Sequence, residues 1–262
     1  GMAMAGVLDR VALVTGAGSA EGIGFATAKA LAAGGARVAL TSTTKRIFER
    51  LETLGDGHAA FTADLTSAKE TDELIRAVNA KFGRIDIVVN NAGMVQQGIE
   101  FKSARIEKIT DEDWQRHLAL NVTTAFNVIR AVLPLMQQRE FGRVVNVSSV
   151  TGPLVVNPRS AGYSSAKAAM TGLTRTTAIE NASRNITCNA VLPGWIATAS
   201  SSKEEILAGK ATPTKRPGSA SEVAAACLFL ASEEASYING AMLVVDGGNS
   251  IVEYKGAGDD WY

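Results

Sequence analysis

Near its start the chain carries the segment Val11-Ala-Leu-Val-Thr-Gly-Ala-Gly-Ser-Ala-Glu-Gly-Ile-Gly24. An apolar run of the length of a buried strand leads into a glycine-rich turn, and an alanine-rich stretch over Gly24–Ala33 has the composition of a helix. Glycines let a tight turn approach a pyrophosphate closely, and the N–H groups at the start of a helix bind such an anion. The segment therefore predicts a strand, a phosphate-binding turn and a helix, with these residues at a nucleotide cofactor: Gly16, Ser19, Gly22, Ile23 and Gly24.

The same alternation continues along the whole chain. Short runs rich in β-branched residues fit buried strands at Val11–Thr15, Arg37–Thr41, Ala59–Thr62, Ile85–Val89, Val144–Val147, Thr187–Leu192 and Met242–Val245. Amphipathic or alanine-rich stretches fit helices at Gly24–Ala33, Ile47–Leu54, Ala68–Phe82, Asp111–Arg139, Ala161–Ser183 and Ser221–Ala231. Apolar strands that alternate with helices indicate a parallel sheet covered on both faces. We therefore predict an α/β fold of the Rossmann type: one domain over residues 1–262, with a doubly wound, mainly seven-stranded parallel sheet, helices on both faces and tails at 1–6 and 251–262.

Composition and charge argue against several other classes of function. Hydrophobic residues make up 46% and charged residues 20%, and Lys+Arg and Asp+Glu are equal at 26 each. A balanced charge provides no footprint for nucleic acid or an anionic membrane, and no uninterrupted apolar run reaches the ~18 residues that a membrane span needs. The two cysteines, Cys188 and Cys227, lie in apolar surroundings, which indicates buried thiols and a reducing, cytoplasmic location. No His, Cys, Asp or Glu cluster has the spacing of a metal site.

Two segments interrupt the alternation. Met94–Thr110 is polar and irregular, and Ile196–Ser219 is rich in Ser, Thr, Lys, Gly and Pro. Each follows a predicted strand at the end of the sheet where ligands of such folds bind. Long connections in compact domains are often lids or binding loops, so we expect both near the ligand, with simple surface insertions as the alternative.

A tyrosine and a lysine stand four residues apart in Gly162-Tyr-Ser-Ser-Ala-Lys-Ala-Ala-Met170, downstream of Ser148-Ser149. Residues four apart share a helix face, so the Lys167 ammonium can lie beneath the Tyr163 phenol. A free tyrosine has a pKa near 10, and a nearby positive charge lowers it. The spacing predicts a tuned proton donor, although an amphipathic helix with this pair by chance explains YxxxK alone equally well.

Further motifs make the chain similar to the short-chain dehydrogenase/reductase family, single-domain branch. That family has a glycine-rich first turn, NNAG after the fourth strand, an Asn-Ser-Tyr-Lys active-site set and Pro-Gly after the sixth strand. The matching residues here are Asn90-Asn-Ala-Gly93, Asn121, Ser149, Tyr163, Lys167, Pro193-Gly194 and the final-strand segment Val245-Asp-Gly-Gly248. The resemblance covers roughly residues 8–250.

The resemblance implies an NAD(P)(H)-dependent enzyme that interconverts a ketone and a secondary alcohol. Tyr163 then donates a proton to the carbonyl oxygen, and Ser149 hydrogen-bonds the same oxygen. Lys167 lowers the tyrosine pKa and contacts the nicotinamide ribose. Asn121, in the kinked middle of the long helix, holds a water that connects Lys167 to solvent. Ser148 is an alternative residue that could contact the substrate.

The resemblance also implies the rest of the cofactor site. Its expected contacts, besides Tyr163 and Lys167, are Asp64, Leu65, Asn90, Ala92, Gly93, Pro193, Gly194, Ile196 and Thr198. The first turn departs from the family pattern because it reads TGx₅GxG, with Ala20-Glu21 as the insertion. The glycines at the helix entrance are kept, so we expect pyrophosphate binding to survive.

The end of the second strand favours NADP(H) over NAD(H). NAD users generally place an acid there to hold the ribose diol, whereas this chain has Ser42 and Thr43, followed by Lys45 and Arg46. Nothing at that position repels a 2′-phosphate, and the hydroxyls and cations can bind it. NAD(H) stays open because Glu21 adds a nearby acid, and the two cations also fit as solvent-exposed residues at the next helix.

Within the family, Phe141–Ser149 and Arg216–Val223 most resemble the 3-oxoacyl-[acyl-carrier-protein] reductases. This implies a 3-oxoacyl thioester substrate and acyl carrier protein as a partner, gripped by Arg184 and Arg139, which fit equally well as solvent-facing residues. Met94–Thr110 is longer than in those reductases, so an NAD-dependent dehydrogenase of a secondary alcohol, sugar or polyol stays open. A non-catalytic nucleotide-sensing module is the third reading, and the intact Asn-Ser-Tyr-Lys set argues against it.

Relatives pair the two long helices, here predicted at Asp111–Arg139 and Ala161–Ser183, between subunits. This implies a homotetramer, with a dimer as the alternative. His58 and His117 are isolated, and we expect both to be packing or surface residues. Trp195 is expected in the core or at the border of the substrate. The tail Ile251–Tyr262 either docks on a neighbouring subunit or frays.

Overall fold

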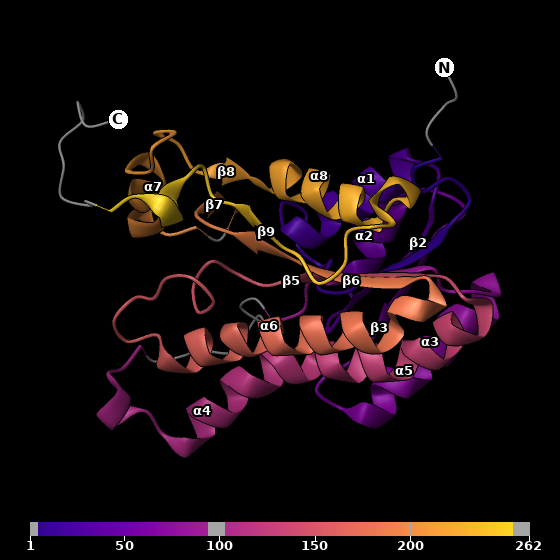
Figure 1. Cartoon of the computed structure of the whole chain (residues 1–262), viewed down its shortest axis with the longest axis horizontal. Helices are drawn as coiled ribbons and strands as arrows, with labels where there is room; N and C mark the ends of the chain where they lie inside the picture. Colours follow the sequence, from indigo (N-terminus) through magenta and orange to yellow (C-terminus); the bar gives the residue numbers. More distant parts are fainter. Residues whose placement is uncertain (1–4, 94–102, 200, 254–262) are drawn as a thin grey trace.

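A parallel sheet of seven strands forms the middle layer of the computed structural model, which describes residues 5–93, 103–199 and 201–253 (Figure 1). The strand order is β3-β2-β1-β4-β5-β6-β9, and every neighbouring pair is parallel. The strands are β1 (Val11–Val14), β2 (Arg37–Ser42), β3 (Ala59–Thr62), β4 (Ile87–Asn90), β5 (Gly142–Val147), β6 (Ile186–Pro193) and β9 (Met242–Val245). The order reverses between β1 and β4, and in such sheets ligands bind outside the carboxyl ends of the strands at this point.

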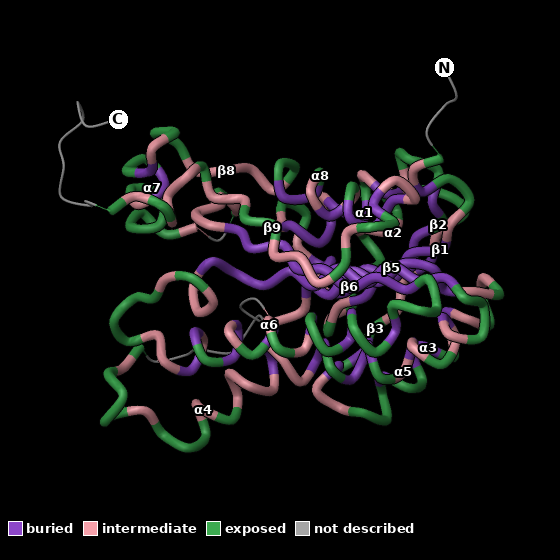
Figure 2. Tube along the Cα trace, in the orientation of Figure 1, coloured by how far each residue is buried: buried purple, intermediate pink, exposed green. Residues whose placement is uncertain are grey.

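Helices cover both faces of the sheet (Figure 1). One layer holds α1 (Ile23–Ala33), α2 (Ile47–Leu54) and α8 (Ala220–Ala231). The other holds α3 (Ala68–Phe82), α4 (Asp111–Leu118), α5 (Thr124–Arg139) and α6 (Ala161–Asn181). The central strands are buried along their whole length because helices shield them on both sides (Figure 2). The predicted fold class is confirmed.

The predicted strands and helices match the observed ones to within a few residues, but the segment Ile196–Ser219 is more regular than expected. It contains helix α7 (Lys203–Lys210) and a short parallel pair, β7 (Ile196–Ala197) with β8 (Gly218–Ser219). Ser202 caps the helix by accepting the N–H of Glu205 at 3.1 Å. A polar helix this short lacks the periodic apolar pattern that predicts a helix, so its sequence resembles a loop.

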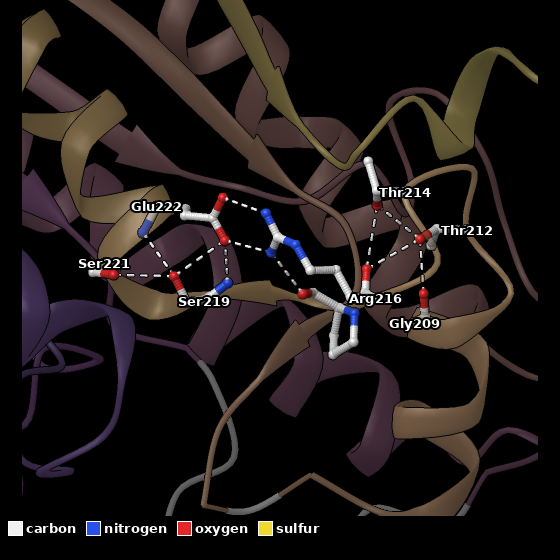
Figure 3. Close-up of polar contacts among 8 residues, drawn as sticks. Gly209, Thr212, Thr214, Arg216, Ser219, Ser221 and Glu222 are labelled. Atoms are coloured by element: carbon white, nitrogen blue, oxygen red, sulfur yellow. Dashed lines mark hydrogen bonds and ion pairs between the residues drawn. The ribbon is translucent and has the colours of Figure 1, made fainter.

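A network of polar contacts fastens α7 to the start of α8 (Figure 3). The guanidinium of Arg216 donates two hydrogen bonds to Glu222, at 2.7 and 2.9 Å, and holds the pKa of that carboxyl at about 2. Ser219 and Glu222 form a capping box at the first turn of α8. Thr212 donates to the carbonyl of Gly209 at 2.7 Å. These bonds fix the segment that carries α7.

The helical stretch from α4 to α5 is long and apolar enough, by length and composition alone, to cross a membrane. In the fold it lies in the second helical layer, where α5 packs on α3 and β5. Its buried residues include Val128, Ile129, Val132 and Met136. Packing against the sheet therefore accounts for the apolar composition of this stretch.

Candidate active site

A cavity of about 890 Å³ opens at the carboxyl ends of β4, β5 and β6. Its walls come from segments far apart in the sequence: the loop from β5 to α6, the first turn of α6, the Pro-Gly segment after β6, and α7. Of the residues predicted for the site, it brings together Ile23, Ser149, Tyr163, Lys167, Pro193, Gly194, Ile196 and Thr198. Trp195 and Ser148 also line it. The expected clustering of these side chains is thus what the tertiary structure shows.

Tyr163 and Ser149 lie side by side in this cavity. A hydrogen bond between them lowers the pKa of Tyr163, but burial is the largest influence and raises it, and the Glu205 carboxylate also raises it. Ser149 accepts the N–H of Thr151 at 3.0 Å. Ser148 donates instead to the main-chain carbonyl of Lys167 at 3.2 Å. The geometry thus favours Ser149 as the partner of the tyrosine.

Lys167 is 2% exposed, and its Nζ lies 5.7 Å from the centroid of the Tyr163 ring. It donates to the carbonyl oxygen of Val147 at 3.4 Å. Burial lowers its own pKa to about 8 because desolvation penalises the ammonium. The sequence predicted that Lys167 lowers the tyrosine pKa. In the structure the influences on the Tyr163 pKa are burial, Ser149 and Glu205, burial is the largest of them, and the phenol has a raised pKa.

Asn121 lies in a π-helical turn, Ala119–Thr123, which joins α4 to α5. Its Nδ2 donates to the carbonyl of His117 at 3.0 Å, whereas its buried Oδ1 has no hydrogen-bond partner among the described residues. Gly93 has a φ of +114°, and a β-carbon there would lie 2.3 Å from the carbonyl oxygen of Leu120. Only glycine permits this approach, which places the NNAG motif against the π-helical turn. An unpartnered buried oxygen suits an ordered water.

The first turn joins the same NNAG motif. Thr15 Oγ1 accepts the N–H groups of Asn91 and Ala92 at 3.0 and 3.1 Å. Gly16 has a φ of +61°, and a β-carbon there would lie 2.5 Å from the Asn91 carbonyl oxygen. Gly22 is the N-cap of helix α1 and offers no side-chain cap, and the first turn holds no acid, so the N–H groups there are left for an anionic ligand. These features fit the pyrophosphate of a dinucleotide.

The insertion in the first turn points outward. Gly22 donates to the carbonyl of Ser19 at 3.2 Å, which closes a turn. Ala20 and Glu21 are exposed at its tip. The extra residues therefore leave the glycines at the helix entrance in place, as the sequence indicated.

The end of β2 borders this turn. A β-carbon at Gly18 would lie 2.7 Å from Nε of Arg46 and 3.0 Å from Cβ of Ser42. The Arg46 side chain therefore lies along the glycine-rich turn, and Ser42 donates to the carbonyl of Thr44 at 2.9 Å. A second cavity of about 530 Å³ is lined by the predicted contacts Thr43 and Asp64. Its other lining residues are Thr66, Gln115, Arg116, Ala119 and Leu120.

Two predicted cofactor residues are turned away from the cavities. The Asn90 side chain is 4% exposed and donates to Oδ1 of Asn146 at 2.9 Å, inside the sheet. Its neighbour Asn91 lines the large cavity and donates to the carbonyl of Gly16 at 3.1 Å. Leu65 is 5% exposed, and its carbonyl accepts from Asn127 at 2.9 Å. Asn91, which was not named from the sequence, is therefore a further residue of this motif at the cavity.

Four charged or titratable residues of the large cavity were not singled out as site residues from the sequence. They are Asp113, His117, Arg159 and Glu205. A signal existed for two of them, because Asp113, His117 and Asn121 follow one another at intervals of four and share a helix face. A β-carbon at Gly162 would lie 2.5 Å from Cδ2 of His117, so this histidine packs against the first turn of α6. Burial lowers its pKa, and Asp113 opposes that shift.

Parts of the sequence predictions lie outside the described residues. They are residues 94–102 of the Met94–Thr110 segment, residues 1–4, and residues 254–262 of the C-terminal tail. Of the first segment, the described part forms a 3-10 turn over Ile106–Lys108, and Ser103, Ala104 and Ile109 line the large cavity.

The fold and the site define an oxidoreductase of the Rossmann class, and comparisons with known proteins show which family it is. A family model described as "Enoyl-(Acyl carrier protein) reductase" matches residues 16–250. A 3-oxoacyl-[acyl-carrier-protein] reductase of Synechocystis sp. is 41% identical over 254 residues, covering 94% of this chain and 98% of that protein. Oxidoreductase UcpA of Escherichia coli is 36% identical over 271 residues, covering 97% of this chain and 100% of its own length.

Among solved structures, the crystal structure of levodione reductase matches with a TM-score of 0.86 and 34% identity, covering 94% of this chain and 99% of that one. The chain belongs to the short-chain dehydrogenase/reductase family. It is an NAD(P)-dependent oxidoreductase, and the predicted enzyme class is confirmed.

Proposed function

We propose that this enzyme uses NADP(H) to reduce a ketone to a secondary alcohol, and that the ketone is a 3-oxoacyl thioester. The observation that carries the reaction is the hydrogen bond between Ser149 and Tyr163 within the cavity of about 890 Å³. It brings two hydroxyl groups to one point, where a carbonyl oxygen can accept from both. Such paired donors stabilise the negative charge that develops on that oxygen.

Proton delivery follows from the surroundings of the phenol. Burial raises the pKa of Tyr163, so the group keeps its proton at neutral pH and can give it to the carbonyl oxygen. When bound, the nicotinamide supplies the hydride that adds to the carbonyl carbon. Lys167, beneath the ring, stabilises the phenolate that remains. The unpartnered Oδ1 of Asn121 would hold a water through which the tyrosine regains a proton.

The preference for NADP(H) rests on Arg46. Its side chain lies along the glycine-rich turn beside Ser42, where the adenosine ribose of the cofactor would lie. A guanidinium there can bind a 2′-phosphate with two parallel hydrogen bonds, and Ser42 offers a hydroxyl in place of a repelling carboxylate. The pyrophosphate would then lie on the start of α1. Pro193, Gly194, Ile196 and Thr198 would contact the nicotinamide.

The substrate class rests on the relative from Synechocystis, a 3-oxoacyl-[acyl-carrier-protein] reductase that is 41% identical to this chain. On this basis acyl carrier protein is a proposed partner, with Arg139 and Arg184 as candidate contacts. The Arg184 guanidinium donates to the carbonyl of Gln137 at 3.4 Å, so it lies at the junction of α5 and α6. A cytoplasmic homotetramer completes the proposal.

The test is the loss of absorbance at 340 nm when acetoacetyl-CoA is added to enzyme with NADPH, and then with NADH. Fast turnover with NADPH and slow turnover with NADH is the expected result. No turnover with either cofactor, in protein that binds both, would refute the thioester substrate.

A second candidate is an NAD-dependent dehydrogenase of a polyol or other secondary alcohol. The carboxylates of Asp113 and Glu205 in the cavity favour it, because carboxylates accept hydrogen bonds from substrate hydroxyl groups. Oxidation of a panel of sugar alcohols with NAD and NADP would reveal it as turnover that acetoacetyl-CoA does not give.

A further inference from the structure

Arg159 lines the same cavity as Tyr163. It stands four residues before the tyrosine, in the loop that leads from β5 into α6. The loop is anchored at this point: Ser160 donates to the carbonyl of Asn157 at 2.6 Å, and Ser103 donates to the carbonyl of Arg159 at 3.5 Å. The main chain of Arg159 is therefore held at the edge of the cavity.

The backbone of Arg159 adopts a conformation that suits glycine better than arginine. Its φ is +67°, in the left-handed region where a β-carbon is strained. The other non-glycine residues with positive φ in the described chain are Asp9, Glu140, Asn185 and Lys215, and none of them lines the cavity. Strain that is kept at a ligand site suggests that the side chain has a use there.

Among the described residues that line the cavity, Arg159 is the exposed cation that an anion can reach. Arg159 is exposed and takes part in none of the ion pairs found among residues 5–93, 103–199 and 201–253. The carboxylates that face the cavity, Asp113 on α4 and Glu205 on α7, would repel a substrate anion near them. Lys167 is 2% exposed and lies beneath the tyrosine ring. Burial lowers the pKa of His117, which favours its neutral form.

We propose that Arg159 binds an anionic group of the substrate and thereby selects ketones that carry a carboxylate or a phosphate in addition to the reacting carbonyl. Arginine suits this role because its planar guanidinium matches either anion with two hydrogen bonds. The inference rests on the proposed reduction of a ketone at Tyr163. It adds a specificity-determining residue and a charge requirement that the reaction itself does not need.

The test compares charged and neutral ketones. The charged pair is acetoacetyl-CoA, which carries phosphates, and acetoacetate, which carries a carboxylate. The neutral pair is acetoacetyl-N-acetylcysteamine and ethyl acetoacetate. Wild type, Arg159→Gly, Arg159→Gln and Arg159→Lys are assayed with NADPH at low ionic strength. Glycine suits the left-handed φ of +67°, so the glycine variant keeps the turn while losing the guanidinium.

The expected result is that the glycine and glutamine variants lose at least about tenfold in kcat/KM for one or both charged ketones, mainly through a higher KM. A loss of this size corresponds to one charge-assisted hydrogen bond. Their kinetics with the neutral ketones stay near wild type, and lysine restores part of the loss. Which charged ketone responds tells phosphate from carboxylate. Equal losses for charged and neutral ketones, or no loss for any of them, would overturn the role of Arg159.

A matched control is Arg76→Gln on α3, an exposed residue that does not line the cavity and that changes the net charge equally. Calorimetric titration of the NADP⁺ complexes, which have no hydride to give to a ketone, with acetoacetate and acetoacetyl-CoA gives a readout without turnover. Weaker binding in Arg159→Gly than in wild type supports the inference, and equal binding contradicts it. If wild type reduces none of the four ketones, the proposed function fails, and this titration still decides the role of Arg159.

Discussion

Lys167 Nζ lies 5.7 Å from the centroid of the Tyr163 ring and donates to the carbonyl of Val147 at 3.4 Å. The two side chains share a face of α6, and the ammonium lies beneath the ring, as their spacing predicts. Burial is the largest influence on both groups: it raises the pKa of Tyr163 and lowers that of Lys167 to about 8. Desolvation therefore dominates the pKa of both groups, and for Tyr163 the hydrogen bond with Ser149 comes second.

Removal of the phenol hydroxyl is expected to abolish catalysis and spare cofactor binding. Tyr163→Phe keeps the ring and its packing but cannot donate a proton, so we expect kcat to fall by about 10²–10⁴-fold, the usual contribution of a general acid. Absorbance at 340 nm measures turnover, and fluorescence titration measures NADPH binding. Near-normal turnover in the variant would remove Tyr163 from its proposed role.

The rate of reduction is expected to fall in alkaline solution. Lys167 has a pKa of about 8, so above that pH it loses the charge that stabilises the phenolate, while the raised pKa of Tyr163 keeps the phenol protonated. The profile of kcat/KM against pH should therefore bend downward near pH 8. A profile that stays level well above that pH contradicts the role of the lysine charge.

The burial of Lys167 predicts a gain in stability when its charge is removed. The lysine pKa is about 8 in the folded protein and 10.5 for a lysine in water, so between these limits the unfolded chain binds more protons and stability rises with pH. Below pH 8 the full penalty, about 3 kcal/mol, is present. Lys167→Met should then raise the free energy of unfolding by up to about 3 kcal/mol at pH 7, less any lost hydrogen bond.

Urea unfolding measures this at pH 7 and again near pH 10, where the advantage of the variant should shrink. A methionine variant that is less stable than wild type at pH 7 would contradict the assigned burial penalty.

Arg46 is expected to control cofactor choice. Arg46→Gln removes the guanidinium beside Gly18 and Ser42, so KM for NADPH should rise roughly tenfold or more, as for a lost hydrogen bond to a charged group. KM for NADH should stay near wild type because NADH has no 2′-phosphate. Lys45→Gln serves as the comparison, because it removes a neighbouring positive charge. Equal effects of the two variants would mean that general charge, rather than the position of Arg46, sets the preference.

Gly162 and His117 are expected to depend on each other. Alanine normally stabilises a helix relative to glycine, but here its β-carbon would lie 2.5 Å from Cδ2 of His117. We expect Gly162→Ala to destabilise the protein by about 1–3 kcal/mol, as for overpacking. In a double-mutant cycle measured by urea unfolding, the added substitution His117→Ala should recover most of the free energy of unfolding that Gly162→Ala loses. Strictly additive effects would show that the two residues do not pack together.

Much of the site could be predicted from the sequence because its signals are local. The glycine-rich turn, the β-branched strands and the spacing of four between Tyr163 and Lys167 follow from rules of backbone and helix geometry. Arg159 and Glu205 give no such signal, because each enters the cavity only when its loop or helix is placed. Helix α7 was not predicted because it is short and polar, and its position depends on contacts such as that of Arg216 with Glu222 in the first turn of α8.

The sequence by itself determined the parallel doubly wound sheet, the nucleotide turn and the tyrosine-lysine helix, because periodicity and glycine placement act over a few residues. Tertiary structure decided which side chains face the ligand. It turned Asn90 into the sheet and Asn91 toward the cavity, and it aligned His117 with Gly162. It also reversed the expected direction of the tyrosine pKa, because desolvation depends on everything packed around a group.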